Sequence, residues 1–281
     1  AAYPLARWSC NGFVIMVHSP QEVAARFVAA RCDAAPLAEF PGSLPADLDS
    51  AYSIQDIAIG NWPRRIAGWK VGRIPVELEG RFGIDRLAGP IFDDTIQSVA
   101  DGGNVRMSAF QGGFAAIEAE YVAVIGRDAP RGKTSWAIED AAAMVEKLCI
   151  GLEVASSPLA TINELGPTAV VSDFGNNAGL IVGPAIHDWR TRPLETMRCK
   201  TYIDGSEVGA GGAFNLTGGF VRSVQFLLEL TAGRDMPLKA GDVIATGQTT
   251  GIHAIRAGQS AKLEFGDDGV VGCTIVKAKP T

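Results

Sequence analysis

Residues 112–126, with the sequence GGFAAIEAEYVAVIG, are apolar except for two glutamates placed two positions apart. A short apolar run bounded by glycines predicts a buried β-strand, in which successive side chains point to opposite faces of the sheet. Ile117 and Tyr121 then share one face, and Glu118 and Glu120 share the other. Two like charges therefore lie side by side on an apolar strand, although glutamate is a poor strand former.

Helical patterns occur at four places in the chain. Near the N-terminus they predict helices over about residues 19–32 and 48–60, and Ser19 in the segment HSPQE can cap the first of them. Two more helices are predicted over residues 134–148 and 218–230. The first pair lies on either side of a proline-rich loop and indicates a small helical region ahead of the rest of the chain.

Short apolar strands and glycine turns dominate from about residue 68 onward. A hairpin is predicted over residues 200–208, with Asp204 and Gly205 as its two-residue turn. Because few helices separate these strands, a curled mixed sheet fits better than a doubly wound one. The sequence thus predicts an α+β fold.

The predicted elements divide the chain into three parts. Residues 1–15 are interpreted as a leader or extension, residues 16–67 as a helical N-terminal region, and residues 68–281 as the main, strand-rich domain. A chain of 281 residues with one such domain can bury a substantial core.

Composition and charge exclude several classes of partner. The chain is 47% hydrophobic and 20% charged, which is typical of a globular protein. Its net charge is −6 and it contains no run of Lys or Arg, so we expect no nucleic-acid partner. No apolar run reaches the roughly 18 residues of a membrane span. The five cysteines are scattered without a CxxC motif, which predicts reduced thiols and a cytoplasmic location.

A third glutamate changes the interpretation of the first two. Alone, Glu118 and Glu120 could be an acid/base pair, a structural salt-bridged pair or metal ligands, and a structural role is the more common one for such a pair. Glu153 lies in another apolar strand pattern, LCIGLEVASS, 33 residues after Glu120, so the two strands can be neighbours. Three carboxylates on adjacent strands form an oxygen-rich site of the kind that suits Mg²⁺, and a cation would remove their repulsion.

Zinc fits this pattern less well than magnesium. Zinc sites are built mainly from cysteine and histidine. The three histidines are far apart in the sequence, and no cysteine–histidine cluster occurs; they are His18, His187 and His253.

The chain resembles the fumarylacetoacetate hydrolase superfamily, and within it the branch of 2-keto-4-pentenoate hydratases and 4-oxalocrotonate decarboxylases. The resemblance extends over about residues 20–278. It rests on an ordered set of short segments: AYSIQD (51–56), GWKVG (68–72), IEAEYVAVIG (117–126), GLEVASS (151–157), NNAGLIVG (176–183), GDVIATG (241–247) and AGQSAKLEFGDDGVV (257–271).

This resemblance implies a fold, a cofactor and a substrate class. The fold is the family's mixed β-roll, preceded by a small helical N-terminal region. Glu118, Glu120 and Glu153 match the family's ligands for Mg²⁺ or Mn²⁺. The substrate is a small 2-oxo acid, and the assembly is a homo-oligomer, a dimer or larger.

Further site residues are predicted around the metal. Lys70 matches the family's lysine, and burial together with a nearby cation would lower its pKa for acid/base work. Arg73 could pair with a substrate carboxylate. Thr246 and Gly247 could present a hydroxyl and a backbone N–H to the substrate. Ser156 is a further candidate, although a hydroxyl that caps a turn explains it equally well.

The implied activity is a metal-dependent hydro-lyase reaction on a small 2-oxo or 2-hydroxydienoic acid, as in 2-keto-4-pentenoate hydratases. The alternatives are a decarboxylase, an acylpyruvate or fumarylacetoacetate-type hydrolase, and a metal-binding partner subunit without catalysis. Two positions depart from the hydratase pattern, since Leu87 and Asn176 stand where many relatives carry an acid. The hydrolases use a His–Glu pair that has no match here, and we interpret the HSPQE segment as helix capping.

Overall fold

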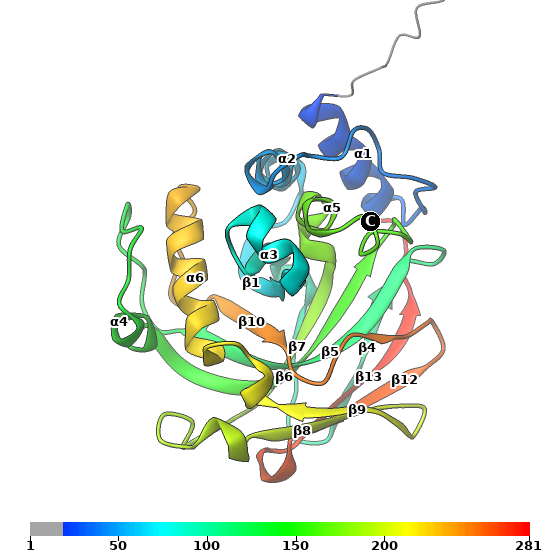
Figure 1. Ribbon diagram of the computed structural model, residues 1–281. Helices are drawn as coiled ribbons and strands as arrows, with labels where there is room; N and C mark the ends of the chain where they lie inside the picture. Colours follow the sequence, from blue (N-terminus) through cyan, green and yellow to red (C-terminus); the bar gives the residue numbers. More distant parts are fainter. Residues whose placement is uncertain (1–18) are drawn as a thin grey trace, which may run out of the picture.

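Two β-sheets form the body of the protein, and helices cover one end of it (Figure 1). The computed structural model describes residues 19–281. The predicted leader over residues 1–15, and the residues 16–18 that follow it, lie outside the described part. Within that part, no helix is long and apolar enough to cross a membrane.

The larger sheet holds eight strands of mixed direction. Its hydrogen-bonded order is β2-β1-β10-β5-β6-β7-β3, and β11 pairs with β5 beside this path. The strands are β1 (Ile66–Arg73), β2 (Arg86–Phe92), β3 (Ile96–Ser98), β5 (Phe114–Ile125), β6 (Val145–Ser157), β7 (Asn177–Ala185), β10 (Val243–Gln248) and β11 (His253–Ala254). β1 runs parallel to β10, and β5 runs antiparallel to both β10 and β6.

The smaller sheet holds five strands in the order β4-β13-β12-β8-β9. They are β4 (Gly103–Ala109), β8 (Arg198–Ile203), β9 (Ser206–Gly212), β12 (Ser260–Glu264) and β13 (Val270–Lys277). The predicted hairpin is confirmed, because Ile203 pairs with Ser206 across the turn Asp204–Gly205. Both turn residues have positive φ, as a two-residue hairpin turn of this kind requires.

The helices follow the predicted pattern at three of four places. They are α1 (Pro20–Cys32), α2 (Leu48–Asn61), α3 (Val76–Phe82), α4 (Ile138–Ala142), α5 (Pro167–Ser172) and α6 (Gly219–Gly233). Short 3₁₀ turns complete the set: η1 (Asp93–Thr95), η2 (Phe174–Asn176), η3 (Leu194–Thr196), η4 (Ala213–Asn215) and η5 (Gly266–Asp268). Ser19 caps α1 as expected, in a reciprocal capping box with Glu22.

The helix predicted over residues 134–148 is wrong. Only Ile138–Ala142 is helical, and β6 begins at Val145. β6 pairs with β5 along nearly its whole length, from Ile125 opposite Val145 to Phe114 opposite Ser157. This long ladder of hydrogen bonds and the burial of its apolar side chains outweigh the local helix propensity of the alanine-rich stretch.

Apolar side chains fill the space between the two sheets. Tyr121 of β5 meets Phe265 there, with their ring centroids 5.5 Å apart, and Leu152 of β6 is fully buried in the same cluster. A second cluster joins α1, α2 and α5 to β2, with Phe27 and Phe174 among its members. In Figure 1 these helices lie together at one end of the larger sheet.

Candidate metal centre

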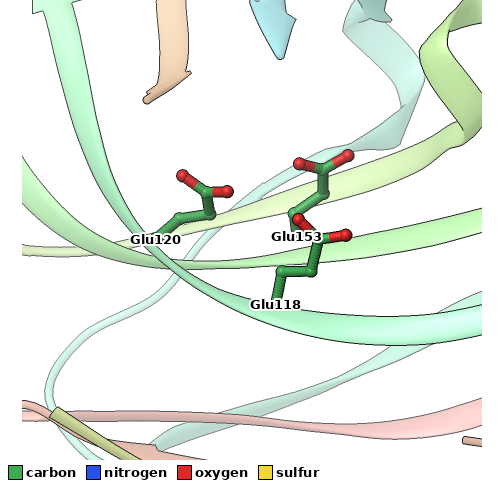
Figure 2. A group of neighbouring side chains, drawn as sticks. All are labelled: Glu118, Glu120 and Glu153. Carbon is green, nitrogen blue, oxygen red and sulfur yellow. The ribbon is translucent and has the colours of Figure 1, made fainter. Parts of the chain in front are cut away.

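Three glutamates meet on one face of the larger sheet. Glu118 of β5 is the register partner of Glu153 of β6, and Glu120 follows two residues along β5 on the same face. Figure 2 shows the three side chains pointing to the same side of the two strands. One carboxylate oxygen from each lies within 4.8 Å of the others, and all three residues are buried.

Two of these carboxylates each have one oxygen bound by the protein and one oxygen left over. Glu120 Oε2 accepts a hydrogen bond from Gly247 N at 2.7 Å, and Glu153 Oε1 accepts one from Asn177 Nδ2 at 3.0 Å. Glu120 Oε1 and Glu153 Oε2 are buried and have no hydrogen-bond partner among residues 19–281. Buried polar atoms normally have partners, so these oxygens suit a hard divalent cation. The residues present fit such an ion.

The electrostatics of the cluster also suit a cation. Burial raises the pKa of Glu118 to about 7, although the charge of Lys70 opposes this rise. Burial, and then the charges of Glu153 and Glu118, raise the pKa of Glu120. Without an ion, both shifts favour the protonated carboxyl groups, and a divalent cation would stabilise the ionised form instead.

Lys70 lies on β1 and reaches the same cluster. Its side chain is 4% exposed, and Nζ lies 3.2 Å from Glu153 Oε1. Nζ also donates to Asn176 Oδ1 at 3.4 Å. The sequence suggested a lowered pKa for this amine. Burial does lower the Lys70 pKa, but the charges of the three glutamates outweigh burial and raise it. These charges therefore favour the ammonium form of Lys70.

The other predicted site residues lie at different distances from the cluster. Thr246 and Gly247 are beside it, but the Thr246 hydroxyl donates to the Tyr121 carbonyl at 2.7 Å. Ser156 is fully buried behind the strand, where its hydroxyl donates to the Phe114 carbonyl. The Arg73 side chain is about half exposed, and its Nη2 lies 3.7 Å from Glu79.

A cavity of about 260 Å³ opens beside the cluster. Its polar lining includes Lys70, Glu118 and Asn176, together with Arg73 and Arg86. The rest of the wall is largely apolar, with side chains from four segments: Leu87, Val170, Leu216 and Ile252. The structure thus brings Lys70, Arg73, Glu118, Thr246 and Gly247 to one cavity, and Ser156 is outside its lining.

Some residues of the centre were missed by the sequence analysis. The Asn177 side chain donates a hydrogen bond to Glu153. Arg86 is buried in the cavity lining, donates to the Thr217 carbonyl and pairs with Asp85. A motif match gave the segment NNAGLIVG without a role for its second asparagine. No local pattern distinguishes Arg86 from a surface arginine.

Residues 88–279 match the model of the fumarylacetoacetate (FAA) hydrolase C-terminal family, which is more than half of the chain. The chain therefore belongs to this family. It is 25% identical over 247 residues to 2-keto-4-pentenoate hydratase 2 of Dechloromonas aromatica, covering 86% of this chain and 91% of the relative. It is also 25% identical over 231 residues to a 2-keto-4-pentenoate hydratase of Paraburkholderia xenovorans, covering 79% of this chain and 82% of the relative.

Solved structures share the fold. The 4-oxalocrotonate decarboxylase of Pseudomonas putida G7, complexed with magnesium and adipate, superimposes with a TM-score of 0.75 at 21% identity, covering 92% of this chain and 97% of the other. A fumarylpyruvate hydrolase of Pseudomonas aeruginosa with Mn²⁺ and pyruvate gives a TM-score of 0.56 at 18% identity, covering 76% and 91%. The family resemblance and the predicted mixed-sheet fold are confirmed.

Proposed function

We propose that the protein is a divalent-metal-dependent lyase that acts on small 2-oxo or 2-hydroxydienoic acids, as its hydratase relatives are named to do. One observation carries this proposal: three buried glutamates with two unpartnered oxygens cluster next to Lys70, and Glu118 and Lys70 of this cluster line a small, mostly apolar cavity. The proposed ligands are Glu118, Glu120 and Glu153, and the proposed ion is Mg²⁺ or Mn²⁺.

When bound, a divalent cation would act as a Lewis acid on the carboxylate and the C2 oxygen of a 2-oxo acid. The protein's own groups hold the ligands in place. Gly247 N–H orients Glu120 and the Asn177 amide orients Glu153, each through one carboxylate oxygen. Such outer contacts fix the direction of the remaining oxygens.

Lys70 is the proposed proton-transfer residue. Its ammonium group is buried at the cavity wall, beside Glu153 and Asn176. From there Nζ can donate a proton to the substrate carbon chain, or stabilise negative charge that develops on the C2 oxygen. The apolar wall around Leu87 and Leu216 would hold the substrate tail and exclude water from it.

The histidines favour a lyase over a hydrolase. His253 lies on β11, where Nε2 contacts the Thr250 carbonyl at 3.1 Å, and His187 is exposed. Of the histidines that the structure describes, neither lines the cavity. A base of the His–Glu type that would activate water is thus not offered by residues 19–281 at this site.

The substitution of an acid by leucine favours a second candidate function. Leu87 is 4% exposed and lines the cavity, so an apolar contact stands where the family resemblance leads us to expect an acid. This change fits a substrate with a less polar tail, or a metal-binding partner subunit without catalysis.

A substrate panel separates these functions. The purified protein would be incubated with Mg²⁺ or Mn²⁺ and, in turn, 2-hydroxydienoates, acylpyruvates and oxaloacetate, while the loss of substrate absorbance is followed. We expect turnover of a 2-hydroxydienoate that stops in excess EDTA. Fast cleavage of acylpyruvates would favour the hydrolase. No turnover of any substrate, with metal binding intact, would favour the partner subunit.

The assembly and the domain division are part of the same proposal. We propose a homo-oligomer, in which residues 68–281 form the catalytic domain and residues 16–67 form a helical N-terminal region. The described cysteines have free thiols, which supports a reducing compartment. Light scattering after size exclusion tests the assembly, and a monomeric mass would contradict it.

A further inference from the structure

Arg31 of α1 is buried, whereas most arginines lie on the protein surface. Its side chain is 5% exposed, and that of its partner Asp173 is fully buried. Nη2 donates to Asp173 Oδ2 at 3.0 Å, and Nε donates to Asp173 Oδ1. The guanidinium group also lies over the rings of Phe110 and Phe174, 5.3 and 5.2 Å from their centroids. A buried, bidentate ion pair of this kind fixes the relative orientation of the two side chains in addition to pairing their charges.

Arg31 also binds the backbone of two neighbouring strands near the metal centre. Nη1 donates to the Asn177 carbonyl at 2.9 Å, and Nη2 donates to the Ser156 carbonyl at 3.2 Å. Asn177 begins β7, and Ser156 lies near the end of β6, three residues after Glu153. One side chain from the helical N-terminal region therefore joins the strand that carries this glutamate to its neighbour β7.

The chain segment next to Asp173 has a conformation that needs such support. Phe174, Gly175 and Asn176 have φ values of 53°, 64° and 53°. Three successive residues in the left-handed region are unusual, and a residue other than glycine costs roughly 1–2 kcal/mol there. The turn also lies directly on β2, because a Cβ atom at Gly89 would come 2.0 Å from the Phe174 carbonyl oxygen.

Two asparagines reach the site from here: Asn176 at the end of this strained turn, and Asn177 directly after it. The Asn176 side chain accepts from Lys70 and donates to Asn163 at 2.9 Å. The Asn177 side chain donates to Glu153. A change in the turn would therefore move the partners of both the ammonium group and a carboxylate.

We propose that Arg31 and Asp173 are a positioning pair, which holds the left-handed turn 174–176 so that Asn176 and Asn177 orient Lys70 and Glu153. The part that concerns the ion rests on the metal site proposed above. Neither residue of the pair lines the cavity, so both act through the asparagines and not on the substrate.

The first test is metal affinity, measured by titration calorimetry with Mn²⁺. Arg31→Met keeps the length and the apolar contacts of the side chain. It removes the guanidinium fork, that is, the pair of N–H donors that binds Asp173. We expect its Mn²⁺ affinity to fall by about tenfold or more, as changes to outer contacts of metal ligands typically do. An unchanged affinity in a folded Arg31→Met protein would overturn the proposal.

Arg234→Met is the matched control. Arg234 is 9% exposed, pairs with Asp56, and lies over the rings of Tyr52 and Trp69. It joins the end of α6 to α2, and its described polar and ring contacts do not include the turn. We expect this variant to lose stability with its Mn²⁺ affinity kept. Equal losses of affinity in both variants would show that Arg31 acts only through general stability.

The double variant Arg31→Met/Asp173→Leu guards against misfolding. Replacing a whole buried ion pair by apolar residues is often neutral for stability, whereas removing one partner leaves a buried charge unpaired. We expect the double variant to fold, and we expect its Mn²⁺ affinity to stay as low as that of Arg31→Met. Recovery of full affinity along with stability would overturn the positioning role. If neither variant folds, Arg31→Lys, which keeps the charge without the fork, takes their place under the same criteria.

Hydrogen exchange gives a readout that needs no metal. The backbone N–H of Asn176 donates to the Asp173 carbonyl at 2.8 Å, so its exchange rate reports on the turn. Arg31→Met should speed exchange in peptides that cover residues 173–178 in metal-free protein, and Arg234→Met should not. Equal exchange in both would contradict the proposal. If the unmodified protein binds no Mn²⁺, the metal site fails, and the exchange result still decides the role of Arg31.

Discussion

Glu118 is a proposed metal ligand whose neutral form the protein favours in the absence of an ion, since burial raises its pKa to about 7. Its substitution therefore separates metal binding from folding. Glu118→Gln keeps the shape of the side chain and removes a charge that burial opposes. We expect metal binding to be lost in calorimetry while the thermal midpoint of the metal-free protein stays level or rises. A variant that unfolds would show that the residue serves the core instead.

Lys70 is the second residue with a separable role. Lys70→Ala removes the buried ammonium group but none of the three carboxylates. We expect turnover of the best substrate to fall by about 10²-fold or more, which is a typical contribution of a proton-transfer group. Mn²⁺ affinity should change little. Turnover equal to that of the unmodified protein would refute the proposed role.

Leu87 gives a prediction about the substrate tail. It is buried in the cavity wall beside β1. Leu87→Asn would place a polar amide there, which should lower kcat/KM for an apolar-tailed dienoate by about tenfold or more, in line with the effect of small changes in an apolar pocket. A dienoate with a terminal carboxylate should lose less. Competition between the two substrates measures this ratio, and equal losses would place the tail elsewhere.

At the scale of elements, the backbone contact between β2 and the turn η2 supports the turn that ends at Asn176 and precedes Asn177. A methyl group at Gly89 would meet the Phe174 carbonyl at 2.0 Å, in a place where backbone packs on backbone. We expect Gly89→Ala to lower the free energy of unfolding by about 1–3 kcal/mol, as overpacking does, and to weaken Mn²⁺ binding as well.

Gly80→Ala is the control for that substitution. Gly80 lies in α3, and an added Cβ atom there meets nothing within 4 Å. Alanine should stabilise this helix by roughly up to 1 kcal/mol. Chemical denaturation measures both variants, and a Gly89→Ala protein as stable as Gly80→Ala would show that the turn yields easily.

Elements differ in how far their own sequence determines them. The strand around Glu118 and Glu120 was predictable, because its apolar residues and flanking glycines are local information. The stretch 134–148 was not, because its alanines favour a helix locally while pairing with β5 makes residues 145–148 a strand. Such pairing depends on a partner 20 or more residues away and leaves no mark in the local pattern.

At the scale of the whole molecule, the same distinction separates the parts of the site that were predictable. The glutamates and Lys70 could be found because each stands in an apolar segment where a charge is conspicuous, and because the segments match a family. Arg31 could not, because it looks like any helix-end arginine. Its partner Asp173 is 142 positions away, so only the folded chain shows the pair.

The response of the whole fold to a metal gives the broadest prediction. Without an ion, three buried carboxylates repel each other, and among residues 19–281 the one ammonium group in contact with them is that of Lys70. An ion that binds only the folded state should therefore stabilise it, by about 2.7 kcal/mol at 100 times its dissociation constant. For a chain of this size we expect Mn²⁺ to raise the thermal midpoint by roughly 5–10 °C over the EDTA-treated protein. Differential scanning calorimetry measures the shift, and Glu118→Gln should show little of it. A midpoint that Mn²⁺ and Mg²⁺ leave unchanged in the unmodified protein would argue that the three glutamates do not form a metal centre.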